Sequence, residues 1–220
     1  MTLFHGIEIN DLEIIALQDI EKIINEVLPL VKDIDYYTDW FGVVVNDETV
    51  EKLGLVEKNI THLAGTIGNL RNLEELNLWN NKLKELPNRL SQLTNLQSLD
   101  LSENQLPSFP KNIFTLTELR YLAISSNQIS SISENIQYLN KLEEFYLTGN
   151  KLTSLPENIG KLENLKTLIL SSNQLKTLPE SIYTLSNLEH LDLRYNKLDM
   201  NSEKLKGWIN KLRSNNVVVD

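Results

Sequence analysis

Residues 73–96 decide the fold, and they read LEELNLWNNKLKELPNRLSQLTNL. Apolar residues stand at fixed positions in this stretch, and the same kind of residue returns 23 positions later. A period of about 20 to 50 residues is the signature of a repeat architecture, in which each unit buries its core against its neighbours. The period therefore predicts a stack of similar units rather than one closed core.

Two apolar columns mark the predicted strands. The first contains Leu53, Leu76, Leu99, Leu122, Phe145, Leu168 and Leu191. The second stands two residues later and contains Leu55, Leu78, Leu101, Ile124, Leu147, Leu170 and Leu193. Side chains two apart in a strand point to the same side, so each unit contributes one short strand with two inward residues. No residue is inserted or lost between Leu53 and Leu205, and every unit should therefore have the same shape.

The repeated pattern resembles the leucine-rich repeat family in its 23-residue form, LxxLxLxxNxLxxLPxxIxxL, of the kind found in intracellular proteins of bacteria and archaea. The resemblance covers about residues 50–200 in seven in-phase copies. It implies an α/β fold, a right-handed leucine-rich-repeat solenoid or horseshoe with a parallel β-sheet on its concave side. Four units carry a proline on the return path, namely Pro87, Pro110, Pro156 and Pro179. Proline disfavours a second strand there and favours loops or short helical turns.

A further column is polar. It contains Asn81, Asn104, Asn127, Asn150, Asn173 and Asn196. Each stands where the chain turns away from the strand, so its amide can bond backbone groups of its own and adjacent turns. Because buried polar groups cost free energy unless they are paired, we interpret this column as a structural ladder and not as a binding site. Lys58 and Ala64 depart from the pattern in the first unit, as suits a terminal repeat.

Both ends of the chain depart from the repeat and predict caps that cover the core of the stack. We expect an N-terminal cap at residues 1–49, repeats at 50–198 and a C-terminal cap at 199–220. In the C-terminal cap, residues 202–213 predict a helix with Asn201 or Ser202 at its start. Its apolar face contains Leu205, Trp208, Ile209 and Leu212, and Val217 to Val219 could add a final strand.

The N-terminal cap begins with a short lead-in at residues 1–9, followed by a predicted amphipathic helix. Asn10 and Glu13 have the spacing of a reciprocal capping box. We expect Glu13 on the polar face of the helix. Apolar residues recur at helical spacing up to Leu28, and Pro29 should end the helix there.

The remainder of this cap predicts a β-hairpin that leads into the repeats. Residues 41–45 and 50–55 are strand-like, and residues 46–48 between them favour a turn. Three aromatic residues precede the hairpin and should pack between the helix and the first strand; they are Tyr36, Tyr37 and Trp40.

The composition excludes several classes of protein. The chain has no Cys, which removes disulfides, thiolate metal sites and thiol nucleophiles and fits a reducing compartment. No secretory signal is visible, and no apolar run approaches the roughly 20 residues of a membrane span. We therefore expect a cytoplasmic monomer.

The net charge of −9 is confined to the N-terminal end. Residues 1–58 carry 13 acidic and 4 basic side chains, whereas residues 59–220 carry 17 of each. Nothing resembles the basic stripe that a phosphate backbone or an anionic membrane demands. Neither nucleic acid nor a membrane surface is expected as a partner.

No set of residues indicates catalysis. The histidines His5, His62 and His190 do not stand at metal-ligand spacing, and there is no glycine-rich phosphate loop. Asp100 and Asp192 share a face but lie four repeats apart, roughly 19 Å at the strand spacing, which is too far for a carboxylate pair. We expect no enzyme, no cofactor and no metal.

The outward strand residues offer a candidate binding surface. They are Trp79, Asp100, Tyr121, Tyr146, Ile169, His190, Asp192, Arg194 and Tyr195. Trp, Tyr and Arg often dominate binding energy when a partner buries them. Small residues between them leave a shallow groove for an extended segment or a helix. The family resemblance implies the same use, and we expect a non-enzymatic scaffold for a protein or peptide partner, in a setting such as signalling.

Two alternatives stay open. The acidic N-terminal cap could dock on a basic protein surface, and such binding should weaken more sharply with salt than binding on the concave face. An enzyme with an unrecognised site is the other alternative, and turnover abolished by Asp192→Ala or His190→Ala would reveal it.

Overall fold

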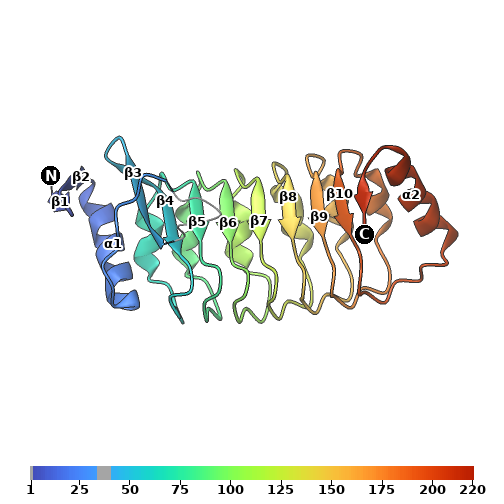
Figure 1. Ribbon diagram of the computed structural model, residues 1–220, viewed down its shortest axis with the longest axis horizontal. Coiled ribbons are helices and arrows are strands. Elements are labelled where there is room, and N and C mark those ends of the chain that lie inside the picture. Colours follow the sequence, from blue (N-terminus) through green and yellow to red (C-terminus); the bar gives the residue numbers. More distant parts are fainter. Residues whose placement is uncertain (1, 34–40) are drawn as a thin grey trace.

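A row of parallel strands forms one side of the molecule in the computed structural model, which describes residues 2–33 and 41–220 (Figure 1). The repeat strands are β5 (Glu75–Asn77), β6 (Ser98–Asp100), β7 (Tyr121–Ala123), β8 (Glu144–Tyr146), β9 (Thr167–Ile169) and β10 (His190–Asp192). They belong to a nine-stranded sheet that also contains β3 (Phe41–Asn46), β4 (Thr49–Leu55) and β11 (Val218–Val219). The strand order is β11-β10-β9-β8-β7-β6-β5-β4-β3. Neighbouring repeats pair without a shift, so that Leu76 lies opposite Leu99 and Leu99 opposite Leu122.

The two apolar columns form one continuous core behind this sheet. No residue of either column is more than 5% exposed. Each strand is too short to bury its own leucines, and burial comes from the equivalent leucines of the units on either side. The predicted α/β solenoid with a parallel sheet is confirmed.

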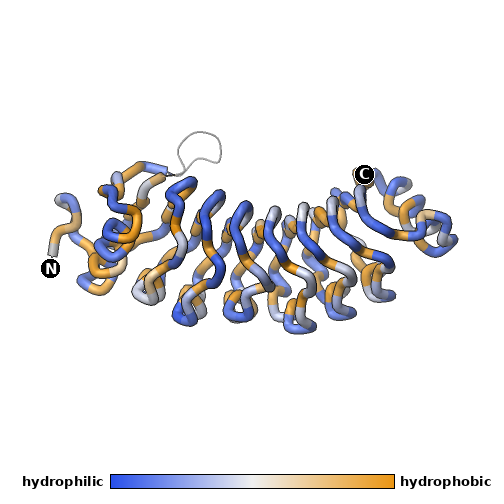
Figure 2. The backbone as a smooth tube through the Cα atoms, turned by 90° about the horizontal axis from the view of Figure 1, so that it is seen from below, coloured by the Kyte–Doolittle hydropathy of each residue, from blue (hydrophilic) through white to orange (hydrophobic). Residues whose placement is uncertain are grey.

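Short helical turns form the opposite side. They are 3-10 helices at Gly65–Asn69, Asn88–Gln92, Lys111–Thr115, Glu134–Tyr138, Glu157–Lys161 and Glu180–Thr184. Four of them begin directly after the prolines of the repeat. Each proline has its φ fixed by its ring and takes an extended conformation at the cap position. Figure 2 shows the resulting arc, with the strands on its hollow side and the helical turns on its outer side.

The predicted hairpin joins the repeats to the N-terminal cap. Strand β3 (Phe41–Asn46) pairs antiparallel with β4 (Thr49–Leu55), and β4 pairs parallel with β5. Asp47 and Glu48 take left-handed conformations in the turn between the two strands. The predicted packing of Tyr36, Tyr37 and Trp40 falls outside the described residues.

The N-terminal helix α1 (Asp11–Ile24) is shorter than predicted. The Asn10 side chain accepts a hydrogen bond of 2.8 Å from the Leu12 N–H and caps the first turn. At the other end, Asn25 takes the left-handed conformation with φ of 53°, which ends the helix four residues before Leu28. Asn tolerates this conformation better than most residues. The helix therefore ends at Asn25, before the chain reaches Pro29.

The predicted faces of α1 and its capping box are partly wrong. Glu13 is 4% exposed, whereas Leu12 and Ile15 are 55% and 44% exposed. The helix is rotated so that Glu13 lies on the buried face with Leu17, and its carboxylate accepts the Val50 N–H instead of reaching back to Asn10. The other carboxylate oxygen of Glu13 has no hydrogen-bond partner among the described residues.

This burial predicts a pH-dependent gain from Glu13→Gln. Burial raises the pKa of Glu13, and the hydrogen bond from Val50 offsets only part of that rise. A raised folded-state pKa means that the stabilisation by protonated Glu13 is complete below its ordinary pKa of 4.5 and is lost as the pH rises through the folded value. At pH 7 the variant should therefore be more stable by about 0.5–1 kcal/mol in urea unfolding, and the difference should shrink towards pH 4. The exposed Glu8→Gln serves as the control; equal gains for both variants would contradict this account.

The lead-in contains a small hairpin that the sequence did not indicate. Strand β1 (Thr2–Phe4) pairs antiparallel with β2 (Ile7–Ile9), and Gly6 has φ of 89° in the tight turn. Phe4 and Ile9 are buried in the same core cluster as α1. Strands of three residues are too short for alternation of apolar and polar residues to indicate them.

The C-terminal cap has the predicted helix. Helix α2 (Glu203–Ser214) buries Leu205, Trp208, Ile209 and Leu212, and the Ser202 side chain caps its start. After α2, strand β11 (Val218–Val219) pairs parallel with β10 and completes the sheet.

Candidate functional site

Five members of the asparagine column are buried in the stack and the sixth, Asn196, is partly buried. Every member forms hydrogen bonds with backbone groups of the preceding repeat. In Asn127, Oδ1 accepts a hydrogen bond of 2.9 Å from the Leu106 N–H, and Nδ2 donates to the Leu101 carbonyl at 3.0 Å. The same two bonds recur at the same spacing in the other five. These amides are occupied by backbone groups and offer nothing to a ligand.

The backward direction of these bonds explains why Lys58 can stand in the first unit. The repeat pattern begins with this unit, so no earlier repeat among the described residues offers Lys58 the backbone groups that the asparagines bind. Lys58 instead pairs with Glu26 of the N-terminal cap at 2.7 Å and lies over the Phe41 ring, 3.4 Å from its centroid. The departure from asparagine thus ties the cap to the stack.

The concave face is built from outward residues that the parallel register aligns in rows. One row runs across the strands through Glu75, Ser98, Tyr121, Glu144, Thr167 and His190. The next row runs through Asn77, Asp100, Ala123, Tyr146, Ile169 and Asp192. Residues that are far apart in the chain are therefore neighbours at the strand spacing of about 4.8 Å.

Two of the predicted site residues form an aromatic pair. The rings of Tyr121 and Tyr146 have centroids 5.4 Å apart and are tilted by 43°. The hydroxyl of Tyr146 donates a hydrogen bond of 2.6 Å to Glu144, which fixes the ring beside a carboxylate. This pair presents aromatic surface and negative charge at the same place.

A hollow of about 620 Å³ adjoins this pair, and we call it the Ser98 hollow. Its acidic lining residues are Glu74, Glu75 and Glu144, and the others are Gln97, Ser98, Arg120, Tyr121 and Tyr146. A second hollow of about 450 Å³ lies beside Phe109 and Phe114, and none of the predicted site residues lines it. A smaller hollow of about 200 Å³ is lined by Arg194 and Tyr195 at the C-terminal end of the face. The Ser98 hollow is the larger of the two that predicted site residues line.

Asp100 and Asp192 each accept a hydrogen bond from the backbone N–H two residues later in the chain. Oδ1 of Asp100 accepts the Ser102 N–H at 2.8 Å, and Oδ1 of Asp192 accepts the Arg194 N–H at 3.0 Å. Burial raises the pKa of Asp100. Burial also acts to raise the pKa of Asp192, but hydrogen bonds, chiefly from Arg194, outweigh it and lower that pKa below its ordinary value. Four strand spacings, about 19 Å, separate Asp100 from Asp192 along the row.

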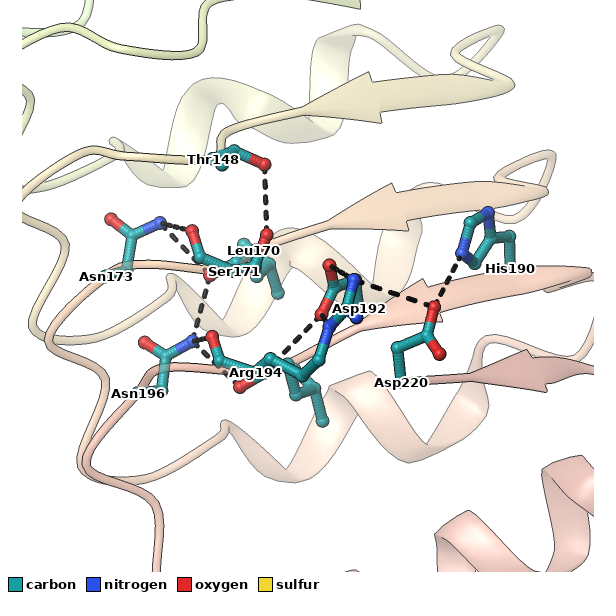
Figure 3. Close-up of polar contacts among 10 residues, drawn as sticks. Thr148, Leu170, Ser171, Asn173, His190, Asp192, Arg194, Asn196 and Asp220 are labelled. Atoms are coloured by element: carbon teal, nitrogen blue, oxygen red, sulfur yellow. Dashed lines mark hydrogen bonds and ion pairs between the residues drawn. The ribbon is translucent and has the colours of Figure 1, made fainter.

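The charged residues near the C-terminal end are engaged with one another (Figure 3). Arg194 donates two side-chain hydrogen bonds to Asp192, of 3.0 and 2.9 Å. Asp220 lies 3.4 Å from His190 and 3.8 Å from Arg194. His190 therefore faces Asp220, a residue that the sequence prediction did not include, and Arg194 has two carboxylates of its own chain.

Exposure separates the remaining candidates. Ile169 is 9% exposed and Asp192 is 4% exposed, so neither presents much surface to a partner, in contrast to the prediction. Tyr195 is 79% exposed at the C-terminal end of the face, and Trp79 is half-buried near the N-terminal end. The structure brings Tyr121 and Tyr146 together, but Trp79 and Tyr195 stand apart from them.

Sequence reasoning missed Glu75, Ser98 and Glu144 as site residues, although the repeat register places them in the row of Tyr121. The available signal was a short side chain, Ser98, between longer ones in the same row. A gap of this kind indicates a recess.

No metal centre is evident in the described parts of the chain. Residues 2–33 and 41–220 contain no group of three or more His, Asp or Glu side chains placed to hold an ion. In the same residues, no helix is both long and apolar enough to cross a membrane.

Comparison with known proteins agrees with this architecture. A family model described as leucine-rich repeat region matches residues 51–148, and two described as leucine rich repeat match residues 140–198 and 187–212. A solved leucine-rich repeat protein of Leptospira interrogans is 41% identical, with a TM-score of 0.69 over 72% of this chain. The match covers only 40% of that protein. No curated protein matches the chain.

The chain belongs to the leucine-rich repeat family. Three family models cover the repeats in succession, and the solved relative shares their fold. Members of this family generally mediate interactions between proteins, which is the coarse function that membership supports.

Proposed function

We propose that this protein is a non-enzymatic scaffold that binds a protein or peptide partner on its concave face. The observation that carries the proposal is the Tyr121–Tyr146 pair beside the Ser98 hollow, in the middle of an open row of strands. Aromatic residues on rigid strands can be buried by a partner with little loss of their own conformational freedom.

The arrangement favours a partner that crosses several strands. Trp79 stands two repeats before Tyr121 and Tyr195 two repeats after Tyr146, so a segment anchored at both ends would pass over the central pair. An extended chain or an amphipathic helix could do this, because the intervening side chains at Ser102, Ser125 and Thr148 are small.

The double variant Trp79→Ala/Tyr146→Ala tests the proposal. Capture of the specific partners should fall at least about tenfold, because interface aromatics of this kind contribute about 2 kcal/mol or more when buried. Quantitative pull-down with tagged wild type and variant measures the loss. Tyr138→Ala, an exposed tyrosine of the Glu134–Tyr138 turn, is the matched control and should bind like wild type. Equal recovery of the same partners by the wild type and the double variant would show that the concave site is misplaced.

A second candidate is docking of the N-terminal cap on a basic protein surface. Exposed apolar side chains accompany its negative charge, and they are Leu3, Leu12, Ile15 and Val27. The variant Glu8→Gln/Leu12→Ser should abolish capture in this case, while Trp79→Ala/Tyr146→Ala should leave capture intact. The two variants thus separate the cap from the concave face.

A further inference from the structure

We propose that the Ser98 hollow receives a lysine or arginine side chain, so that the partner on the concave face is a basic segment. This inference rests on the proposed function, because it assumes that the concave face binds a partner. It goes further by assigning the chemistry of the recognised residue and the place where that residue sits.

The hollow has the shape of a slot for one long side chain. Glu75 on β5 and Tyr121 on β7 flank Ser98 on β6 in one row. Two strand spacings separate the flanking residues, about 10 Å, and the short Ser98 side chain leaves the space between them unfilled. An ammonium or guanidinium group fits such a space with its stem lying over the strands.

The walls of the slot favour a cation. The tilted Tyr121 and Tyr146 rings offer electron-rich faces, and the hydrogen bond from Tyr146 holds the Glu144 carboxylate next to them. On the opposite wall, the Glu75 carboxylate already pairs with Lys52 of this chain at 2.9 Å. Glu144 is therefore the wall carboxylate that an incoming cation would pair with first. A cation placed between an aromatic face and a carboxylate gains both cation–π and ionic attraction.

The charges of the face around the Ser98 hollow also favour a cation, because negative charge is in excess there. Lys52 and Arg194 are its cations, and each already pairs with carboxylates of this chain. Arg120 at the rim pairs with Glu143 at 2.8 Å. In contrast, Asp100, Glu103 and Glu144 take part in none of the ion pairs between described residues. A basic partner would supply the missing positive charge.

The negative charge of the concave face changes which experiment can distinguish binding on that face from docking of the N-terminal cap. Both the concave face and the N-terminal cap would now bind a basic surface, so both should weaken with salt. Variants at the slot are therefore needed in place of a salt titration.

A phage-displayed library of random peptides, selected on the wild-type protein, provides the probe. Enriched peptides should share a Lys or Arg, and changing that residue to Gln should lower the affinity of the synthetic peptide about tenfold or more by fluorescence anisotropy. Ser98→Arg fills the slot with a cation and should lower affinity by the same factor. Glu75→Gln/Glu144→Gln removes charge without adding bulk and should also do so. Ser154→Arg places the same substitution on an exposed site outside the concave rows and should have no effect.

Three outcomes would overturn the proposal: no enrichment, enriched peptides without a common basic residue, or undiminished binding to both slot variants. If peptides without a basic residue bind the wild type but not Trp79→Ala/Tyr146→Ala, the cation site is wrong and the proposed function stands. If the peptides bind all of these variants equally, both are wrong. Circular dichroism and thermal unfolding establish that each variant is folded before its binding is compared.

Discussion

Replacement of Asn127 by alanine should lower the free energy of unfolding by about 1–3 kcal/mol. The side chain satisfies the Leu106 N–H and the Leu101 carbonyl, and both of these residues are at most 1% exposed. The Leu101 carbonyl keeps a second hydrogen bond, of 3.1 Å, from Nδ2 of Asn104. The substitution therefore leaves the buried Leu106 N–H without its partner, and one such buried group costs about 1–3 kcal/mol. Denaturant unfolding followed by circular dichroism measures the loss.

Asn140→Ala is the matched control for this substitution. Asn140 is an exposed residue on the outer side, and only its backbone carbonyl is used by a neighbouring repeat. The control should stay within about 0.5 kcal/mol of wild type. A loss for Asn127→Ala no larger than that of the control would show that the ladder contributes little to stability.

Phe145→Ala should destabilise the protein by about 3–5 kcal/mol. Phe145 is the aromatic member of the first strand column and is completely buried. Its ring meets Phe109 edge to face at 6.4 Å, and Phe109 stacks on Phe114 at 5.2 Å. Truncation opens a cavity in the middle of the stack, where repeats on both sides hold the walls apart.

Phe145→Leu provides the informative comparison, because leucine occupies this position in the other six units. It should recover most of the loss, leaving a cost of about 1.5 kcal/mol or less if the neighbouring rings can close in. Tyr138→Ala removes an exposed ring and should change the same denaturant midpoint little. Similar midpoints for Phe145→Ala and Phe145→Leu would mean that ring volume is not what stabilises the centre.

The repeats could be predicted almost completely, whereas the caps could be predicted only in part. In the repeats, Leu76 and its equivalents face identical neighbours, so local pattern and tertiary contact give the same answer. In α1 the local pattern and the tertiary contact do not agree. Helical periodicity shows that apolar residues recur on one side of the helix, but it does not fix which side packs against the hairpin. Glu13 lies on the buried stripe while Leu12 stays exposed, and only the docking of the helix decides that.

The candidate site divides in the same way. The register alone places Tyr121 beside Tyr146, and the structure has that pair. The repeat register could not show that Asp220 lies beside β10, next to His190 and Arg194. This contact depends on how the chain runs after α2. The register also could not show that Ile169 is covered, since an outward position in the register is exposed only if its neighbours leave it so.

The backward reach of the asparagine ladder has a consequence for biosynthesis. A ribosome makes the N-terminal units first, and each asparagine bonds backbone groups that lie 21 and 26 residues earlier in the chain. The amide of a nascent repeat therefore needs only partners that have already been synthesised. Each new turn can close on the one before it as it emerges, and the N-terminal cap, with Lys58 in place of asparagine, is the surface on which this growth begins.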